Sequence, residues 1–498
     1  MSNIRRQSII SSVLIYMGFA FGAINTYLFA RNNFFTTDQF GLTRVILIAG
    51  NLFNSFACLA LPSVIYKFAP YYKGNLKDKD NDLLSVALVL AFIGFVMTTL
   101  VGFIFEPLVI KKFSDKSALF VQYYFLVFPY LFFYLFFNIL EAYAWSVKET
   151  VISNFLREAG NRISVTILIV LFIVCGFSFS LFIKIFSCLW GISFLGLFFY
   201  LMKVGKLHFT FKISRVTKRY WKKMALLMGF VYAGLVITTL SASLDTFTIA
   251  SYWGIGSVAI YDVSNYISNI ISVPQKSVVA ISTSYLSEAW RNKDLATIQR
   301  IYSRSSINLL LISIFLFTLI WLNYDTVMDI LPLNPVYREG KMVVLLFGFK
   351  FIVDMGTGVN SQIIGTSTYW RFEFTCGVIL LSLIAPLNIV LVKHLGIIGA
   401  GYSNLIAYTI YNAIRIVFLW KKFNLQPFTI KTVYALVISL VCYFICYFLF
   451  HNMHSWFSLF LTSGVYVALF GAAALYFNLS PDILPVWQTM KKRLGIKQ

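Results

Sequence analysis

The chain has 498 residues, of which 59% are hydrophobic and only 12% are charged. Soluble domains are about 45–50% apolar and about 25% charged, so the composition argues against a soluble globular enzyme and indicates a polytopic membrane protein. The net charge is +22, an excess that membrane proteins collect in their cytoplasmic loops. Binding to nucleic acid is therefore not expected.

Apolar segments follow one another along the whole chain, each near the roughly 20 residues that a membrane-spanning helix needs. The first begins after a charged head, MSNIRRQ, and is long for a signal peptide, with no clear cleavage site. We therefore expect an uncleaved first helix. We predict about 14 transmembrane helices, at residues 8–30, 42–68, 83–105, 118–141, 151–175, 178–202, 224–250, 258–284, 305–323, 341–365, 373–392, 397–420, 431–450 and 457–477.

Lysine and arginine are distributed unevenly between the two sides that these helices define. With the N-terminus in the cytoplasm, 30 of the 41 basic residues fall in cytoplasmic segments and eight in external ones. Cytoplasmic loops are the ones that carry the excess of basic residues. The distribution therefore predicts that both termini are cytoplasmic.

Residues 203–223 form the longest internal loop, with eight lysines or arginines and no acidic residue. Two interpretations are open. The loop determines topology between two halves of the chain, or it docks on anionic lipid, where each basic residue near the surface contributes about 1 kcal/mol. The first interpretation is favoured, and the two are compatible.

The second half of the chain repeats the pattern of the first at an offset of 222 residues. Residues 136–151 align with 358–373, which pairs Asn138 with Asn360, and similar spans, glycine-bearing turns and basic exits follow each segment. Six spans in each half give both halves the same orientation, so the repeat is parallel. Transport sites commonly lie between such halves.

The repeat predicts an all-α fold of two six-helix bundles with two additional helices. The expected organisation has four parts: an N-terminal bundle at 1–202, a basic cytoplasmic linker at 203–223, a C-terminal bundle at 224–422, and two further helices with a basic cytoplasmic tail at 423–498.

Polar residues recur inside several spans, where a charge at the bilayer centre costs at least about 2.5–3.5 kcal/mol. In the span 258–284 they are spaced three or four residues apart, which places them on one helical face. Pro274 predicts a kink or break near the end of this face. The stripe consists of Asp262, Asn265, Asn269, Ser272 and Lys276.

Two interpretations of these polar residues remain open. They are contacts between helices, with Lys350 and Asp354 forming an internal ion pair, or they line a hydrated cavity. For the charged residues taken together the cavity is favoured. Its lysines would suit an anionic headgroup, and its aspartates would suit proton or cation coupling. The candidate substrate and ion cavity comprises Asn25, Arg31, Asn51, Asp245, Asp262, Asn265, Asn269, Lys276, Lys350 and Asp354.

Motifs of catalysis and of nucleotide binding are absent from the sequence. It contains no HExxH, no GxSxG, no Walker loop and no segment of paired carboxylates. We therefore expect a protein that is not an enzyme and that uses no cofactor and no metal site.

Four segments resemble the oligosaccharide flippase family, the O-antigen and capsule repeat-unit exporters of the MOP exporter superfamily, known as polysaccharide biosynthesis proteins. They are TTDQFGLTRV (36–45), AYAWSVKETVISNFLREAGNR (142–162), IGSVAIYDVSNYIS (255–268) and GIIGAGYSNLIAYTIYNAIRIVFLWKKF (396–423). The resemblance covers nearly the full length. It implies two six-helix bundles in a V, two further helices in some members, and alternating access.

The same resemblance implies a function and a set of partners. The substrate would be an oligosaccharide linked to undecaprenyl pyrophosphate, moved from the cytoplasmic to the periplasmic leaflet of the bacterial inner membrane for surface polysaccharide such as lipopolysaccharide. Implied partners are this lipid-linked oligosaccharide, a coupling ion (H⁺ or Na⁺), membrane lipids and a polysaccharide polymerase.

Three alternatives stay open at this point. Lipid II flippases resemble the chain in plan but carry several arginines in their cavity helices, whereas the spans 224–250, 258–284 and 341–365 have none. Cation-coupled drug antiporters of the superfamily usually have twelve helices. A membrane-embedded glycan-processing enzyme generally needs a large external loop, and the longest one here covers only about 324–340.

Overall fold

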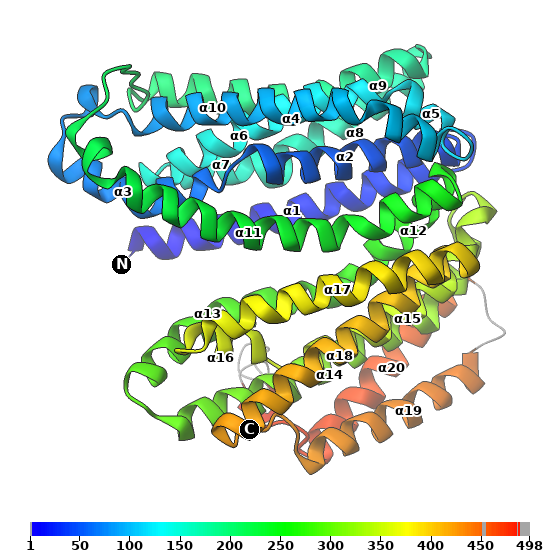
Figure 1. Ribbon diagram of the computed structural model, residues 1–498. Coiled ribbons are helices and arrows are strands. Elements are labelled where there is room, and N and C mark those ends of the chain that lie inside the picture. Colours follow the sequence, from blue (N-terminus) through cyan, green and yellow to red (C-terminus); the bar gives the residue numbers. More distant parts are fainter. Residues whose placement is uncertain (1, 451–454, 486, 489–498) are drawn as a thin grey trace. The chain divides into compact units, whose positions relative to one another are not determined.

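The computed structural model describes residues 2–450, 455–485 and 487–488, and its regular structure over these residues is helical, with no β-strand (Figure 1). Long apolar helices make up most of it. The expectation of an all-α polytopic membrane protein is confirmed. Residues 489–498 of the expected cytoplasmic tail lie outside the described part.

By its internal contacts the chain divides into two compact units, Met1–Ala259 and Ile260–Gln498, which are described one at a time. The long helix α11, which follows the basic segment 203–223, packs against α2, α3 and α4 of the first unit. The division into two six-helix bundles stays a prediction, because the units are defined by contacts alone. The helices of the first unit are α1 (Ser2–Ala30), α2 (Thr37–Ala57), α3 (Leu61–Asn75), α4 (Leu83–Phe113), α5 (Ala118–Gln122), α6 (Val127–Ser146), α7 (Thr150–Phe155), α8 (Asn161–Cys175), α9 (Phe179–Cys188), α10 (Trp190–Lys203) and α11 (Arg215–Tyr252).

The expected span 42–68 is two helices in the structure. The first, α2, begins with a capping box in which Thr36 and Gln39 each accept a hydrogen bond from the other's backbone N–H, both at 3.1 Å. It ends where Leu59 and Ala60 adopt the left-handed conformation, with positive φ. The chain then restarts as α3, with a proline in its first turn, where a missing N–H costs no helical hydrogen bond.

Between α7 and α8 the chain forms a π-helical turn, Leu156–Gly160, within one continuous span, Thr150–Cys175. Such a turn inserts an extra residue into a helix and is frequent at functional sites. Here it contains Arg157, which contributes to the site described below.

The second unit starts with an interrupted helix. A 3-10 turn, Ile270–Ser272, separates α12 (Ile255–Asn269) from α13 (Val273–Arg291), directly before Pro274. The expected break at this proline is confirmed. The remaining helices are α14 (Leu295–Ile330), α15 (Lys341–Gly356), α16 (Asn360–Thr366), α17 (Trp370–Leu395), α18 (Ile397–Phe423), α19 (Ile430–Phe450) and α20 (Trp456–Tyr476).

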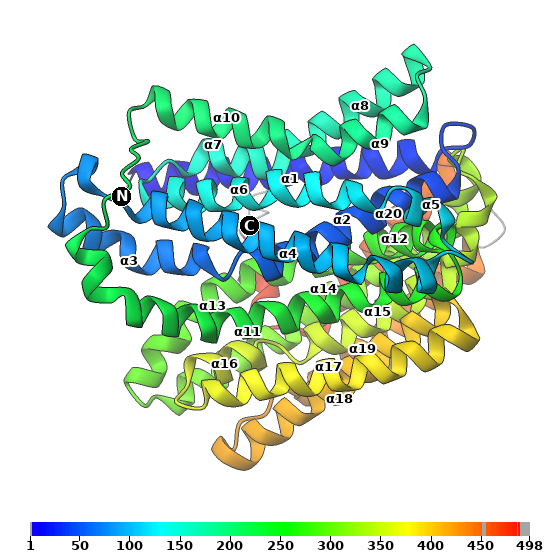
Figure 2. The same ribbon diagram turned by 45° about the horizontal axis from the view of Figure 1, so that its top comes forward.

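A second interruption separates α15 from α16, which are bent by 45° with respect to each other. Gly358 lies at this bend with a φ of +68°, a conformation that glycine adopts without strain. Further along, α17 and α18 lie side by side (Figure 2). The two additional helices, α19 and α20, pack on α14 through Ala435, Cys446, Tyr466 and Phe470.

Ten described helices are long and apolar enough to cross a membrane, and the bent pair α15–α16 would be an eleventh. The remaining expected spans, 8–30, 258–284 and 397–420, coincide with α1, the α12–α13 pair and α18. These last two carry polar residues that lower their mean hydropathy. The total of fourteen spans stays a prediction.

Large apolar side chains are exposed along the outer helices, as on α4, where Phe92, Met97, Leu100 and Ile104 are all uncovered. The same holds for Val433, Leu440, Phe444 and Phe448 on α19. Soluble proteins rarely expose contiguous apolar patches of this extent. These faces fit contact with lipid acyl chains.

Candidate functional site

The structure distributes the ten expected cavity residues over both units. Asn25, Asn51 and the buried Asp245 lie on α1, α2 and α11, and Arg31 directly follows α1. The other six belong to the second unit, on α12, α13 and α15. In the second unit, Asp354 joins a network with residues of α13, α16 and α18.

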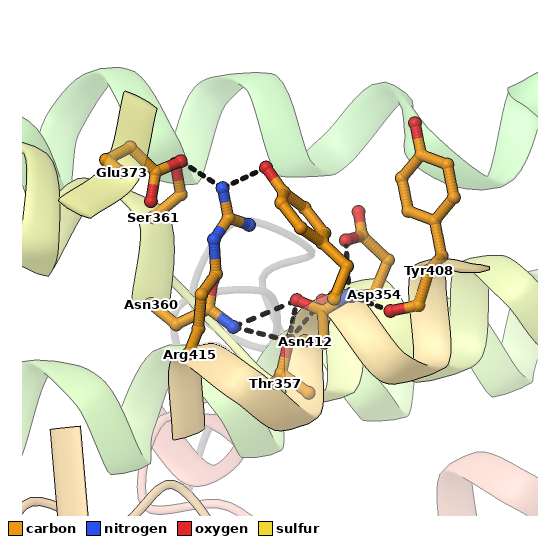
Figure 3. Close-up of polar contacts among 9 residues, drawn as sticks. Asp354, Thr357, Asn360, Ser361, Glu373, Tyr408, Asn412 and Arg415 are labelled. Carbon is orange, nitrogen blue, oxygen red and sulfur yellow. Dashed lines mark hydrogen bonds and ion pairs between the residues drawn. The ribbon is translucent and has the colours of Figure 1, made fainter. Parts of the chain in front are cut away.

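A buried polar network joins α15, α16 and α18 around Asp354 (Figure 3). Asn412 donates from Nδ2 to Asp354 Oδ1 at 3.0 Å, and its own Oδ1 accepts from Asn360 Nδ2 at 2.9 Å and from the Thr357 hydroxyl at 3.1 Å. Asn412 is 1% exposed. Gln275 of α13 donates to the other oxygen of Asp354 at 3.3 Å. Three helices, α13, α15 and α18, therefore meet at the carboxylate of Asp354, and α16 joins the network through Asn412.

One turn after Asn412, Arg415 forms a buried ion pair with Glu373 of α17. Arg415 is 4% exposed, and its guanidinium also donates to the Tyr411 hydroxyl and lies 3.7 Å from the centre of that ring. Ser361 donates to the same carboxylate at 2.7 Å. Removing charges from water is costly, and a partner charge together with extra hydrogen bonds offsets this cost.

Lys350 lies one turn before Asp354 on α15, yet no ion pair joins these two described residues. The ammonium lies over aromatic rings instead, 4.3 Å from the centre of Tyr408, 4.7 Å from Phe351 and 5.3 Å from Phe347. Aromatic faces attract cations through their quadrupole. The Lys350 side chain thus carries a positive charge inside a predicted span, and cation–π contacts with aromatic rings stabilise that charge.

The first unit holds a second network, on α2, α6 and the π-helical turn. Arg157 forms an ion pair with Glu141, which is 3% exposed, and donates to Asn138 Oδ1 at 2.5 Å. Asn138 in turn donates to Asn54 Oδ1 at 3.4 Å.

The two networks contain the asparagines that the repeat pairs, Asn138 and Asn360. In both, a glutamate–arginine pair with one buried partner is close by, and in both the second carboxylate oxygen, Glu141 Oε1 or Glu373 Oε2, is buried without a hydrogen-bond partner among the described residues. The arrangement differs, because the glutamate lies on the asparagine's own helix only in the first unit. The sequence repeat predicted the pairing of Asn138 with Asn360, which stays a prediction, and it did not predict their charged neighbours.

Sequence reasoning missed Glu141, Glu373, Asn412 and the two arginines, and it counted Arg157 and Arg415 among cytoplasmic loop charges. The structure places each of them in an ion pair with a glutamate, and the side of the membrane on which they lie stays a prediction. The sequence did contain features that distinguish Glu141 and Arg415. Glu141 is the only acid in the long aromatic run 117–148, and Arg415 follows Asn412 by three residues on one helical face.

The remaining candidates have more local contacts. Asn269 donates to the backbone and side-chain oxygens of Asn265, at 2.9 and 2.8 Å, so this part of the α12 stripe is satisfied within its own helix. Asp262 is half-buried, and Lys276 is exposed.

In the first unit, Asn25 bridges two helices. It donates to the backbone oxygen of Arg162 at 2.9 Å and accepts from Thr166 at 2.6 Å, which favours a packing role. Arg31 lies over the Phe34 ring at 4.7 Å. Asn51 keeps a buried side-chain oxygen without a hydrogen-bond partner.

Comparison with known proteins identifies the fold. No family model and no curated protein matches the sequence. Among solved structures, the lipid II flippase MurJ in an inward closed conformation matches with a TM-score of 0.73, covering 94% of this chain and 99% of the flippase at 16% identity. An inward-facing multidrug resistance MATE family transporter of the MOP superfamily matches with a TM-score of 0.59, covering 83% of this chain and 99% of the transporter at 14% identity.

A MOP superfamily transporter from Pyrococcus furiosus, described as having a binding pocket of reversed polarity, matches with a TM-score of 0.57. The match covers 84% of this chain and 95% of that protein at 14% identity. At such identities the likeness concerns the fold alone. The chain therefore has the fold of MOP-superfamily transporters.

Proposed function

We propose that the protein is a flippase that moves an oligosaccharide linked to undecaprenyl pyrophosphate from the cytoplasmic to the periplasmic leaflet of a bacterial inner membrane. It would act by alternating access and serve the synthesis of a surface polysaccharide such as O-antigen. The fold and the four resembling segments support this proposal. In it, the polyprenyl tail stays in the bilayer and only the anionic, hydroxyl-rich head crosses.

The environment of Lys350 is the observation that best supports the proposal. It places an ammonium inside an apolar span on aromatic faces, without a carboxylate partner among the described residues. A charge in a membrane span is costly and marks a functional site by default. A pyrophosphate would supply the missing counter-charge. The neighbouring Asp354, whose oxygens accept two amide donors, would bind the coupling ion.

The proposal is tested by transport of a lipid-linked oligosaccharide in proteoliposomes. Lys350→Ala should reduce the flipping rate at least about tenfold, since one charge–charge contact contributes a few kcal/mol in a low-dielectric site. Lys350→Arg should restore part of the activity. Lys184→Ala serves as the control, because Lys184 is an exposed lysine on α9 in an apolar span.

A deletion strain tests the same proposal in cells. Lipid-linked repeat units should accumulate on the cytoplasmic leaflet, and the surface polysaccharide should be depleted. Normal surface polysaccharide combined with altered sensitivity to cationic drugs would contradict the proposal and favour a drug antiporter.

A lipid II flippase is the second candidate, favoured by the TM-score of 0.73 to a protein of that function. Complementation separates the two. In a strain depleted of its lipid II flippase, this chain should fail to restore growth if it moves surface-polysaccharide units. Restored growth would favour the second candidate.

A further inference from the structure

A small basic pocket lies at one end of the first unit, apart from both polar networks. It has a volume of about 50 Å³ and is lined by the end of α3, the α3–α4 connection, the end of α6 and the segment after α10. One buried water needs about 10–15 Å³, so the pocket has room for about four oxygen-sized atoms. That is the size of a phosphate group.

The groups that line this pocket are mostly hydrogen-bond donors. Lys73 and Lys206 contribute ammonium groups, and His208 contributes an imidazole. Asn81 uses its side-chain oxygen to accept from the Leu83 N–H at 3.1 Å, which leaves its NH₂ group as a donor. Asp78 is the only acidic residue of the lining. The chemistry of the pocket therefore fits an oxyanion.

The basic residues are held close together by contacts between elements. Lys73 donates to the Ser146 backbone oxygen at the end of α6 at 2.6 Å, and the Tyr143 hydroxyl donates to the Lys206 backbone oxygen at 3.0 Å. Burial and the neighbouring ammonium groups of Lys148 and Lys206 lower the pKa of Lys73, and Asp78 opposes them. A bound anion would relieve this crowding of positive charge.

The segment that supplies Lys206 and His208 also exposes large apolar side chains. Phe211 is 88% exposed, and Phe209 and Ile213 are exposed as well. The backbone of this segment is fixed along the start of α4, because Thr210 N–H donates to Ser85 at 3.0 Å and Ser214 N–H donates to Asp82 at 2.8 Å. These apolar side chains are therefore presented on an ordered support.

The pocket lies beside the first residue of α4, where the expected membrane span begins. The charged stretch 77–82 precedes α4, and its apolar run starts at Leu83, which lines the pocket. Lipid phosphates lie at this boundary, and aromatic side chains are enriched there. Basic groups beside exposed aromatic and aliphatic groups form the combination that binds an anionic bilayer surface.

We propose that this pocket binds the phosphate of an anionic membrane lipid, with Phe211 inserted into the bilayer beside it. The segment 203–223 then contributes a specific lipid site in addition to its charge. This inference does not rest on the proposed transport activity, since it concerns other residues and a resident lipid. Failure of either proposal leaves the other unchanged.

Lipid binding by the purified full-length protein tests the site, with phosphatidylglycerol and phosphatidylcholine as probes. Wild-type protein should bind phosphatidylglycerol more tightly, as measured by native mass spectrometry and by thermal stabilisation in detergent. The variant Lys73→Ala/Lys206→Ala should weaken this binding about 10- to 30-fold, since each lysine near the surface contributes a factor of about five. Lys73→Arg/Lys206→Arg should retain most of it, which separates loss of charge from loss of folding.

The matched control is Lys67→Ala/Lys222→Ala. These two exposed lysines lie on α3 and in the same basic segment, outside the pocket lining. The control should change phosphatidylglycerol binding less than about threefold. Equal losses in the control and the pocket variant would overturn the proposal, because binding would then depend on total charge alone.

Phe211→Ser distinguishes a lipid from a soluble anion. It should weaken binding to phosphatidylglycerol vesicles and leave the weak response to inorganic phosphate unchanged. If inorganic phosphate stabilised the protein as strongly as phosphatidylglycerol and Phe211→Ser had no effect, the lipid proposal would be wrong and the pocket would be a site for soluble phosphate.

Discussion

Each unit contains a glutamate–arginine pair in which one partner is buried, Glu141 in the first and Arg415 in the second. Breaking a buried pair by removing one partner leaves an uncompensated charge and costs about 3–5 kcal/mol. Glu141 is 3% exposed but the Arg157 side chain is 37% exposed, so we expect Arg157→Ala to lower the free energy of unfolding by less than this, about 2 kcal/mol, because Glu141 would lose its charged hydrogen-bond partner. Thermal or denaturant unfolding in detergent measures the effect.

Two further variants control this experiment. Glu141→Leu/Arg157→Leu should recover part of the stability, because no charge remains, although Asn138 loses a donor. Arg162→Ala breaks a wider pair, at 4.0 Å, with Glu158, whose side chain is 29% exposed compared with 4% for Glu141, and it should cost less than about 1 kcal/mol. Similar losses for Arg157→Ala and Arg162→Ala would argue against a special role of the buried pair.

In the proposed function Asp354 binds the coupling ion, so we expect its replacement to impair ion-coupled transport. Asp354→Asn keeps an oxygen that can accept from Asn412 but removes the charge that would bind H⁺ or Na⁺. Transport driven by an ion gradient should fall at least about tenfold, whereas exchange of substrate without a gradient should continue. Glu339→Gln, at an exposed loop position, controls for charge removal. Gradient-driven transport at the wild-type rate in Asp354→Asn would exclude this role.

Helices are the level at which the sequence predicted most. Long apolar runs indicate spans because a membrane leaves backbone groups no partner outside the helix, and proline indicates breaks, as at Pro274. The division of residues 42–68 at Leu59 and Ala60 was not predicted, since neither residue type favours a left-handed backbone. The partners of Asn412 and Arg415 depend on how α15, α17 and α18 pack, which a single sequence does not specify.

The bend between α15 and α16 carries a prediction at the scale of the element. A Cβ atom on Gly358 would lie 2.8 Å from Ser305 Oγ and 2.9 Å from the Ser306 backbone nitrogen, in a left-handed backbone. Gly358→Ala should therefore destabilise the protein by at least about 2 kcal/mol. Gly365→Ala, on the adjacent helix with nothing within 4 Å, should be neutral or stabilising. Equal thermal stabilities of the two variants would contradict the role assigned to the bend.

At the scale of the whole molecule, the repeat seen in the sequence and the two buried networks point in the same direction. Each unit positions one repeat-related asparagine near a glutamate–arginine pair, and the elements that hold the pair differ. In the second unit the network includes the carboxylate of Asp354, and Lys350 lies on the same helix over aromatic rings. Among the described residues the two networks are therefore chemically unequal, and in the proposed function the second unit would bind the anionic substrate and the coupling ion.

Orientation in the membrane is the prediction that concerns the whole chain. Leaving the ion-paired Arg157 and Arg415 out of the count places 28 of the other 39 basic residues on the expected cytoplasmic side, so the asymmetry persists. Alkaline phosphatase fused after Lys206 should be inactive, because the segment 203–223 should remain in the cytoplasm. The same enzyme fused after Asn334 should be active. A fluorescent protein, which folds in the cytoplasm, should give the opposite pattern at the two sites. Phosphatase activity after Lys206, or fluorescence after Asn334, would reverse the predicted orientation.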